Sequence, residues 1–342
     1  MTVPVLTFFN NKGGVGKTSL AYHLAWMMSE IGHRVLACDL DPQSNLTAMF
    51  LDEDRLEAIY DKSDSGLDQP SETIFESLRP LMQVGDLNLP APHFISDKLS
   101  LIAGDLGLAG FEDTLSAEWP NALRSAELHR SFRIQTAFST VMQKSARKMD
   151  ASIILADVGP NLGAINRSAL IATDYVVVPV GADLFSLRGL RNLGPTLHNW
   201  RDDWKKRLAN WPEPDFDLPK GLMQPIGYVV QQHSIRLSRP VKAYDTWVNR
   251  IPEEYARELL GYTEGPYPPT PASDDHALAA LKHYRSLVPL AQEARKPVFK
   301  LTSADGAIGS HAVAANSAYD DFRELARNIL ERVPELRARA DR

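Results

Sequence analysis

A glycine-rich segment directly behind an apolar run leaves few folds open to this chain. The apolar run is Val3–Phe9, and the segment reads Lys12-Gly-Gly-Val-Gly-Lys-Thr18. Glycines allow the backbone to turn its N–H groups inward without Cβ clashes, which creates a concave site for an anion. The residues that follow carry a helical apolar stripe, and a helix that begins there points its positive N-terminal end at the same site. The sequence therefore predicts a strand, a phosphate-binding loop and a helix in succession.

Individual positions of this loop have separate expected roles. Lys17 supplies a positive charge for the β- and γ-phosphates of a nucleotide, and the Thr18 hydroxyl is placed to bind Mg²⁺. The expected nucleotide-binding residues are Gly13, Gly14, Val15, Gly16, Lys17, Thr18 and Ser19. A glycine-rich turn that ends in Lys-Thr by chance is the alternative, and the strand, loop and helix context disfavours it.

The additional lysine at the start of the loop, Lys12, makes the motif more specific. Lys-Gly-Gly-Val-Gly-Lys-Thr resembles the deviant Walker A box of the ParA/MinD family of P-loop ATPases. The resemblance implies ATP or ADP and Mg²⁺ as cofactors, and a homodimer that forms when ATP binds. It also implies that Lys12 reaches across this dimer to the partner's phosphates, where its charge would assist hydrolysis. The alternative is a solvated loop lysine.

Carboxylates end two further apolar runs. Asp39 and Asp41 lie in the stretch Asp-Leu-Asp-Pro-Gln43 behind the second run, and Asp157 ends the run from Ile153. The carboxyl ends of parallel strands lie at the same edge of a sheet, and open α/β folds bind their ligands at this edge. The resemblance implies that Asp41 is catalytic, with Lys12 and Lys17, because it positions the attacking water. It further implies that Asp39 supports the magnesium shell and that Asp157 holds Mg²⁺ through water.

The first carboxylate motif has an alternative interpretation, and the second departs from the family's sequence pattern. Asp39 and Asp41 could instead be solvated carboxylates of an Asp-Pro turn. Behind Asp157, the run Val158-Gly-Pro-Asn161 replaces the Asp-x-Pro-Pro run that is frequent in the family. The geometry of this second switch segment is therefore open.

Nearly continuous apolar runs predict strands that are buried on both faces of a parallel sheet. The predicted strands are Val3–Phe9, Val35–Asp39, Leu99–Ala103, Ile153–Asp157, Tyr175–Val180, Ile226–Val230 and Val298–Leu301. Helical patterns lie between them, including a crossover helix over 131–149 and a closing helix over 316–333. We expect an α/β fold with a doubly wound, mostly parallel sheet flanked by helices. One P-loop ATPase domain would span 1–342, with insertions at about 52–97, 205–225 and 252–290.

Composition sets outer limits on location and partners. The longest apolar runs are too short to span a membrane, and no signal-type segment precedes the first strand, so we expect a cytoplasmic protein without a membrane partner. The single cysteine, Cys38, lies in an apolar run and is expected to be buried. With a formal net charge of −6, any contact with nucleic acid requires a local basic patch.

The resemblance continues behind the strand at Ile226–Val230. Family members contact adenine there, which implies base contacts for Gln231 and Gln232. Many members also bind non-specific DNA nearby, and the matching residues here are Arg236, Arg239 and Lys242. Scattered surface charge is the alternative. Only about ten residues precede the loop, too few for a helix-turn-helix, so we expect DNA binding without sequence preference.

Together these motifs favour a Mg²⁺-dependent ATPase that dimerises around ATP. It would act as a nucleotide-driven switch in DNA partition or cargo positioning, with a partner protein that stimulates hydrolysis. Two alternatives remain: an ATP-dependent synthetase or ligase that phosphorylates a small molecule, and a switch ATPase of a defence system. The stretch from Asp39 to Gln43 resembles the partition branch and favours the switch.

Overall fold

Six of the seven predicted strands form part of one eight-stranded sheet in the order β3-β4-β2-β5-β1-β6-β7-β8. The computed structural model describes residues 2–63, 71–83, 85–124, 128–231, 241–282, 284 and 286–340, without the side chains of 61–63, 241–244 and 338–340. Among the strands of the described residues, only β3 runs antiparallel to its neighbour, β4. The strands are β1 (Val5–Phe8), β2 (Val35–Asp39), β3 (His93–Ser96), β4 (Leu99–Ile102), β5 (Ile153–Asp157), β6 (Tyr175–Gly181), β7 (Gln224–Gln231) and β8 (Ala277–Leu281).

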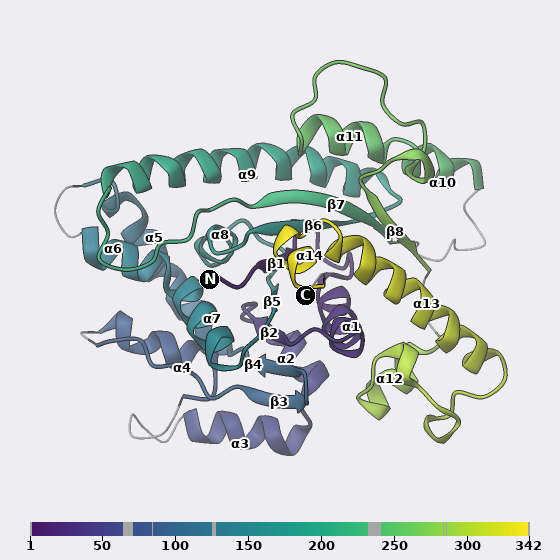
Figure 1. The fold of residues 1–342 in the computed structure, drawn as a ribbon, viewed down its shortest axis with the longest axis horizontal. Helices are drawn as coiled ribbons and strands as arrows, with labels where there is room; N and C mark the ends of the chain where they lie inside the picture. The colour runs from purple at the N-terminus through teal and green to yellow at the C-terminus, as the bar shows by residue number, and fades with distance from the viewer. Residues whose placement is uncertain are drawn as a thin grey trace.

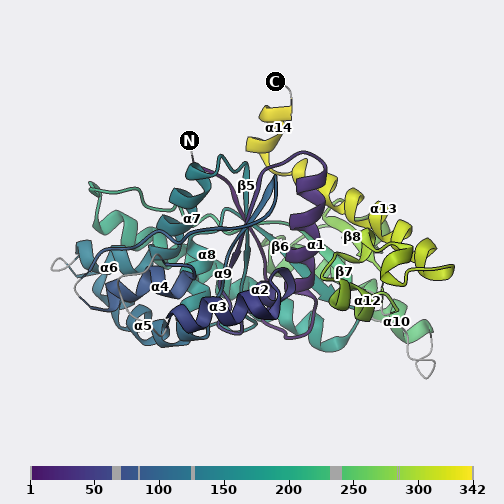
Figure 2. The same cartoon turned by 90° about the horizontal axis from the view of Figure 1, so that it is seen from below.

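Helices cover both faces of this sheet (Figures 1 and 2). One face packs against α1, α2 and α13, and the other against α5, α7, α8, α9 and α11. The predicted doubly wound, mostly parallel α/β fold is therefore confirmed. The helices are α1 (Lys17–Glu30), α2 (Asn45–Phe50), α3 (Glu53–Ser63), α4 (Ile74–Leu78), α5 (Phe111–Asn121), α6 (Leu128–Gln135), α7 (Ala137–Lys148), α8 (Ala164–Ile171), α9 (Leu184–Asn210), α10 (Val241–Val248), α11 (Ile251–Glu258), α12 (Val288–Ala294), α13 (Ser310–Leu330) and α14 (Pro334–Ala340).

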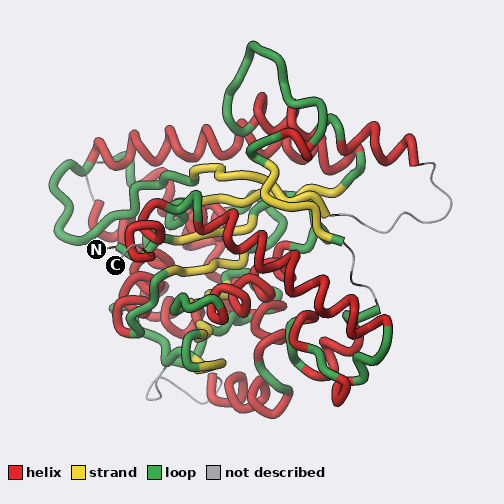
Figure 3. Tube along the Cα trace, turned by 45° about the vertical axis from the view of Figure 1, so that its right-hand side comes forward, coloured by secondary structure: helices red, strands yellow, loops and turns green. Residues whose placement is uncertain are grey.

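Parallel pairing places the carboxyl ends of the central strands side by side. β2 pairs with β5 in a register that sets Asp39 opposite Asp157, and β1 lies between β5 and β6. The loop that leaves β1 and both carboxylates thus meet at one edge of the sheet. In the tube view the strands form a continuous layer within the helices (Figure 3).

The predicted strand at Val298–Leu301 is wrong. Val298–Lys300 form a short 3₁₀ turn behind Pro297, and the apolar side chains of Val298, Phe299 and Leu301 are buried under the helical layer. Burial on a helix surface and burial in a strand give the same short apolar pattern. The strand that pairs with β7 is β8, which was not predicted and lies inside the predicted insertion 252–290.

Several predicted boundaries also differ from the structure. The crossover helix over 131–149 is two helices, α6 and α7, which meet at Thr136, whose hydroxyl donates to the Phe132 carbonyl. The predicted connection 205–225 begins as helix, because α9 continues to Asn210. The closing helix is confirmed as α13, whose apolar stripe packs in the same cluster as α1. Cys38 is buried as predicted. Among the described helices, none has the length and apolar character needed to cross a membrane.

Candidate nucleotide-binding site

The glycine-rich loop between β1 and α1 has the backbone shape that its sequence predicts. Gly14 and Gly16 adopt left-handed φ values of 71° and 79°, which side chains with a Cβ rarely tolerate. The Lys17 ammonium is buried and donates to the carbonyls of Asn10 (3.0 Å) and Lys12 (3.2 Å). Burial lowers its pKa, against the opposing charges of Asp157 and Asp41. These two carbonyls hold the Lys17 ammonium against the loop backbone.

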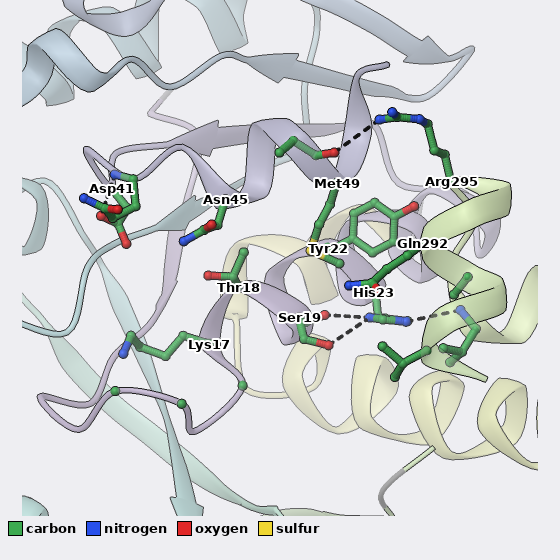
Figure 4. A pocket seen from close by; sticks show the side chains of 18 of the residues that line it. Lys17, Thr18, Ser19, Tyr22, His23, Asp41, Asn45, Met49, Gln292 and Arg295 are labelled. Carbon is green, nitrogen blue, oxygen red and sulfur yellow. Dashed lines mark hydrogen bonds between the residues drawn. The ribbon is translucent and has the colours of Figure 1, made fainter. Parts of the chain in front are cut away.

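A pocket of about 760 Å³ opens over this loop (Figure 4). Its volume lies within the usual range for small-molecule and cofactor sites. One end is formed by the loop and by Asp41, and the other end by α1, α2 and α12. The lining includes the predicted residues Gly13, Gly14, Gly16, Lys17, Thr18, Ser19 and Asp41.

Asp39 is buried at the end of β2 and is hydrogen-bonded by its own chain. Its Oδ2 accepts from the backbone N–H (2.8 Å) and the hydroxyl (2.7 Å) of Thr47, and its Oδ1 accepts from the Asp41 N–H (3.2 Å). Burial raises the pKa of Asp39 to about 6, although the bonds from Thr47 lower it. Asp39 thus fixes α2, which carries Thr47, behind Asp41. Its predicted support of a magnesium shell stays a prediction.

Asp157 is fully buried, and neither of its oxygens has a geometrically satisfactory hydrogen-bond partner in the described part of the chain. Burial and the charge of Asp39 raise its pKa well above the ordinary value, against the effects of Thr18 and Lys17. A buried carboxylate without a partner is costly unless a cation neutralises it. Mg²⁺ is commonly held by one or two carboxylates together with phosphate oxygens and waters. The donor chemistry of Asp157 and Thr18 therefore fits Mg²⁺.

The loop behind β5 lies against Asp41. We refer to residues 158–163, between β5 and α8, as the switch loop. A Cβ added to Gly159 would lie 3.2 Å from Asp41 Oδ1, and Val158 and Pro160 line the pocket. Asp41 Oδ1 also accepts from the Gln43 N–H at 3.0 Å. The carboxylate predicted to position water thus lies between the turn that precedes α2 and the switch loop.

Lys12 is held outside the pocket of its own subunit. Its Nζ lies 2.7 Å from Asp183 Oδ2 and 2.9 Å from Oδ1, and it also donates to the Ser186 hydroxyl at 3.0 Å. The Lys12 ammonium is therefore held at the start of α9 and not in the pocket that Lys17 and Asp41 line, although the sequence grouped these three residues.

The predicted base contacts are only partly described. Gln231 ends β7 beside the loop, with its Nε2 3.4 Å from the position of a Cβ on Gly16, and it lines a second cavity of about 190 Å³. Gln232 lies outside the described residues. Arg236 and Arg239, two of the predicted DNA contacts, also lie outside them. Lys242 belongs to α10, and its side chain is not among those described.

The far end of the large pocket is formed by residues that the sequence did not identify. They are Tyr22, His23, Met49, Gln292 and Arg295, from α1, α2 and the region of α12 (Figure 4). The Arg295 guanidinium donates to the Leu51 carbonyl, which ties the end of α12 to the end of α2. None of these positions belongs to a motif that the sequence analysis identified.

His23 connects the loop helix to the C-terminal part of the chain. One ring nitrogen, Nδ1, lies 2.7 Å from the Ser19 carbonyl, and the other, Nε2, lies 3.2 Å from the Val298 backbone nitrogen. A carbonyl only accepts and an N–H only donates, so the proton of the neutral ring is on Nδ1. The ring also stacks on Phe322 of α13 at 4.7 Å.

Comparison with known proteins assigns the family. Residues 3–210 match the family model described as AAA domain. The chain is 28% identical over 208 residues to the chromosome partitioning protein ParA of Caulobacter vibrioides, covering 60% of this chain and 66% of that protein. It is 28% identical over 199 residues to the cell division protein PomZ of Myxococcus xanthus, covering 57% of this chain and 52% of that protein.

These matches are partial in length. The chain spans about half of PomZ and about two thirds of ParA. A solved structure of a Corynebacterium diphtheriae protein shares the fold over 97% of this chain and 99% of that chain, with a TM-score of 0.69 at 22% identity. The family model covers more than half of the chain, including the glycine-rich loop and both carboxylate-bearing strands. The chain therefore belongs to the ParA/MinD family of deviant Walker A P-loop ATPases.

Proposed function

We propose that this protein is a Mg²⁺-dependent ATPase that acts as a nucleotide-driven switch. The observation that carries the proposal is that Lys17 and Asp41 line one pocket, while the buried Asp157, which has no hydrogen-bond partner among the described residues, lies close enough for its charge to act on Lys17. The loop N–H groups and Lys17 bind the phosphates, and Asp41 orients the attacking water. Mg²⁺, held by Thr18 and Asp157, would neutralise charge on the phosphate oxygens.

Two copies of the chain form the active unit around ATP in this proposal. Lys12 is only 29% exposed in its side chain, but it is directed away from its own pocket. Apolar side chains of the segments that follow β5 and β6 are exposed at the same edge of the sheet, namely Leu162 (39%), Leu184 (37%) and Phe185 (69%). Exposed apolar groups beside a ligand site favour a protein interface. A second copy placed there brings its own Lys12 to the phosphates.

The switch would position DNA or another cargo. ParA of Caulobacter vibrioides is named for chromosome partitioning and PomZ of Myxococcus xanthus for cell division, which supports a role in positioning. In this proposal the ATP dimer binds non-specific DNA through Arg236, Arg239 and Lys242, and a partner protein stimulates hydrolysis. Hydrolysis then separates the two subunits and releases the bound DNA.

The proposal is tested by turnover and oligomeric state together. The parent protein should release phosphate from Mg²⁺–ATP without an added acceptor, which a small-molecule synthetase would require. Lys17→Ala should neither bind nor hydrolyse ATP, whereas Asp41→Ala should retain ATP and remain a dimer. Lys205→Ala, a surface lysine on α9 that pairs with Asp202, is the control. No turnover by the parent would contradict the ATPase, and a monomeric Asp41→Ala protein with bound ATP would contradict the dimer.

A further inference from the structure

The switch loop is held in place mainly from α8. Asn166 of α8 donates through Nδ2 to the carbonyls of Gly159 (2.9 Å) and Asn161 (2.7 Å). The Asn161 side chain in turn accepts from the Gly163 N–H at 2.9 Å. These bonds attach the switch loop to the first turn of α8. The position of that turn therefore determines where Gly159 lies relative to Asp41.

The first turn of α8 is fixed by a carboxylate from a different part of the chain. Glu112 lies on α5, and its Oε1 accepts from the Ala164 N–H at 2.5 Å while its Oε2 accepts from the Ile165 N–H at 2.8 Å. These two donors have no partner within their own helix. A negative charge at this end also interacts favourably with the helix dipole. Glu112 thus satisfies two backbone groups and supplies the charge that this helix end favours.

Glycine at the end of the switch loop permits this contact. A Cβ added to Gly163 would lie 2.6 Å from Glu112 Oε1, closer than real Cβ contacts. Gly163 has an extended backbone with φ of −76°, so its conformation does not itself require glycine. A side chain at this position would therefore have to displace the Glu112 carboxylate from the start of α8.

A second contact, made by Trp119, anchors α5 against α8 and α9. The ring of Trp119, further along α5, lies 4.1 Å from the Arg167 guanidinium of α8 and 3.6 Å from the Arg207 guanidinium of α9. Arg207 also donates to the Trp119 carbonyl at 3.0 Å. Because α5 is anchored at this end, its Glu112 end is a fixed support for α8.

We propose that Glu112 is a positioning residue that sets the distance between the switch loop and Asp41. It does not line the pocket, so its effect reaches the reaction only through α8 and Gly159. The inference rests on the proposed ATPase function, because it assigns a role in orienting the water near Asp41.

The test compares two glutamates of the same helix. Glu118 is also on α5 and hydrogen-bonded, but it accepts from Ser131 (2.7 Å) and Arg130 (3.1 Å), which belong to α6. We expect Glu112→Ala to lower kcat by about 10- to 100-fold, because small misplacements of reacting groups have effects of this size. KM for ATP should stay within about twofold, since the phosphate-binding loop is unchanged. Glu112→Gln should retain part of the rate, as its amide oxygen still accepts one N–H. Glu118→Gln should keep the parent kcat.

Amide hydrogen exchange separates the positioning role from the proposed function. The amides of Ala164 and Ile165 should exchange faster in Glu112→Ala than in Glu118→Gln, measured at equal distance below each variant's melting temperature. Parent-like kcat in Glu112→Ala, or exchange at these amides equal to that of Glu118→Gln, overturns the inference. A parent protein without turnover instead overturns the proposed function, and the positioning role falls with it, whatever the exchange at Ala164 and Ile165.

Discussion

Lys12 and Asp183 form a bidentate ion pair that joins the start of the glycine-rich loop to the start of α9, with Nζ 2.7 Å from Oδ2 and 2.9 Å from Oδ1. Burial alone would raise the pKa of Asp183, but hydrogen bonds from Lys12 and Ser186 hold it below its ordinary value. The carboxylate therefore stays ionised, and keeps Lys12, throughout the neutral range. If Lys12 acts on the partner's phosphates, it must first leave Asp183.

Asp183→Asn should therefore favour dimerisation. The amide keeps the ability to cap α9, since it can still accept from the Ser186 N–H, but it no longer offers Lys12 a negative charge. We expect the ATP concentration for half-maximal dimer formation to fall by about fivefold, equivalent to ~1 kcal/mol for a partly exposed pair. Light scattering coupled to size-exclusion chromatography, over an ATP titration, measures this midpoint.

The matched control is Asp203→Asn on the same helix. Asp203 pairs with Lys206 on the surface, away from the loop, and its replacement should leave the midpoint unchanged. An Asp183→Asn midpoint equal to that of this control would show that the pair does not compete with dimer formation.

Asp157→Asn should remove the effect of Mg²⁺ on nucleotide binding. In the parent, Mg²⁺–ATP should raise the melting temperature more than ATP with EDTA, because bound Mg²⁺ should lower the Kd for ATP. A ligand stabilises the folded state more the further its concentration exceeds its Kd, by about 2.7 kcal/mol at 100 times Kd. The variant should show the same shift under both conditions, since a neutral amide does not replace the charge of Asp157. Differential scanning fluorimetry measures both shifts, with Asp202→Asn as a surface control. A parent-like Mg²⁺ effect in Asp157→Asn would place the metal elsewhere.

The parts of the site that could be predicted are those in which sequence order determines position. Loop glycines act within a few residues, and parallel strands bring Asp39 and Asp157 to the same edge whatever surrounds them. The Lys12–Asp183 pair links positions 171 residues apart, so only the folded chain places Lys12 beside α9. No local pattern indicates such a contact.

The sheet edge and the far end of the pocket could not be predicted for the same physical reason. β8 reads Ala-Leu-Ala-Ala-Leu, without a β-branched residue, and its pairing with β7 determines its conformation. Gln292 and Arg295 come from a region without a motif, and they reach the pocket because α12 packs near His23 and Val298. Tertiary contacts override local preference at both places.

Gly194→Ala should destabilise the protein. A Cβ at this position of α9 would overlap the backbone carbonyl of Glu258 at the end of α11, which α9 also binds through the Arg191–Glu254 ion pair. Replacing a helical glycine at an open site gains about 1 kcal/mol. We expect a loss of about 1–3 kcal/mol instead, because the backbone must shift to relieve the overlap. Urea unfolding gives the sign, with exposed Asn199→Ala on α9 as the control. A stabilised Gly194→Ala protein would contradict the close α9–α11 packing.

The double variant Arg236→Ala/Arg239→Ala should weaken binding to non-specific duplex DNA in the ATP state. Each cation that contacts a phosphate contributes about one unit to the slope of log affinity against log salt, so the slope should fall by about two. Lys205→Ala/Lys206→Ala is the control, because these lysines pair with Asp202 and Asp203 on α9. Fluorescence anisotropy across salt concentrations measures both slopes. Equal slopes in the parent and in the Arg236/Arg239 variant would exclude these arginines as DNA contacts.

The parent protein should lose stability in mild acid through His23. Burial lowers the pKa of His23 to about 4, against the hydrogen bond to Ser19, while the unfolded chain keeps the ordinary value near 6.5. Between these values the unfolded state binds more protons than the folded state, so stability falls as pH falls from about 6.5 to about 4. A difference of this size corresponds to about 3 kcal/mol at most.

The comparison that isolates this effect uses His23→Gln and a second histidine. His23→Gln should be less stable than the parent at pH 7.5, because the amide cannot reproduce the stacking on Phe322. The difference should shrink toward pH 4.5, since only the parent pays for keeping a neutral ring. His311→Gln on α13 is the control for a histidine replacement outside this contact. Urea unfolding at the two pH values measures the differences, and a His23→Gln difference that does not change with pH would mean that the buried ring does not resist protonation. The outcome also bears on the pocket, because a charged His23 can no longer accept the Val298 N–H that joins α1 to the segment behind α12.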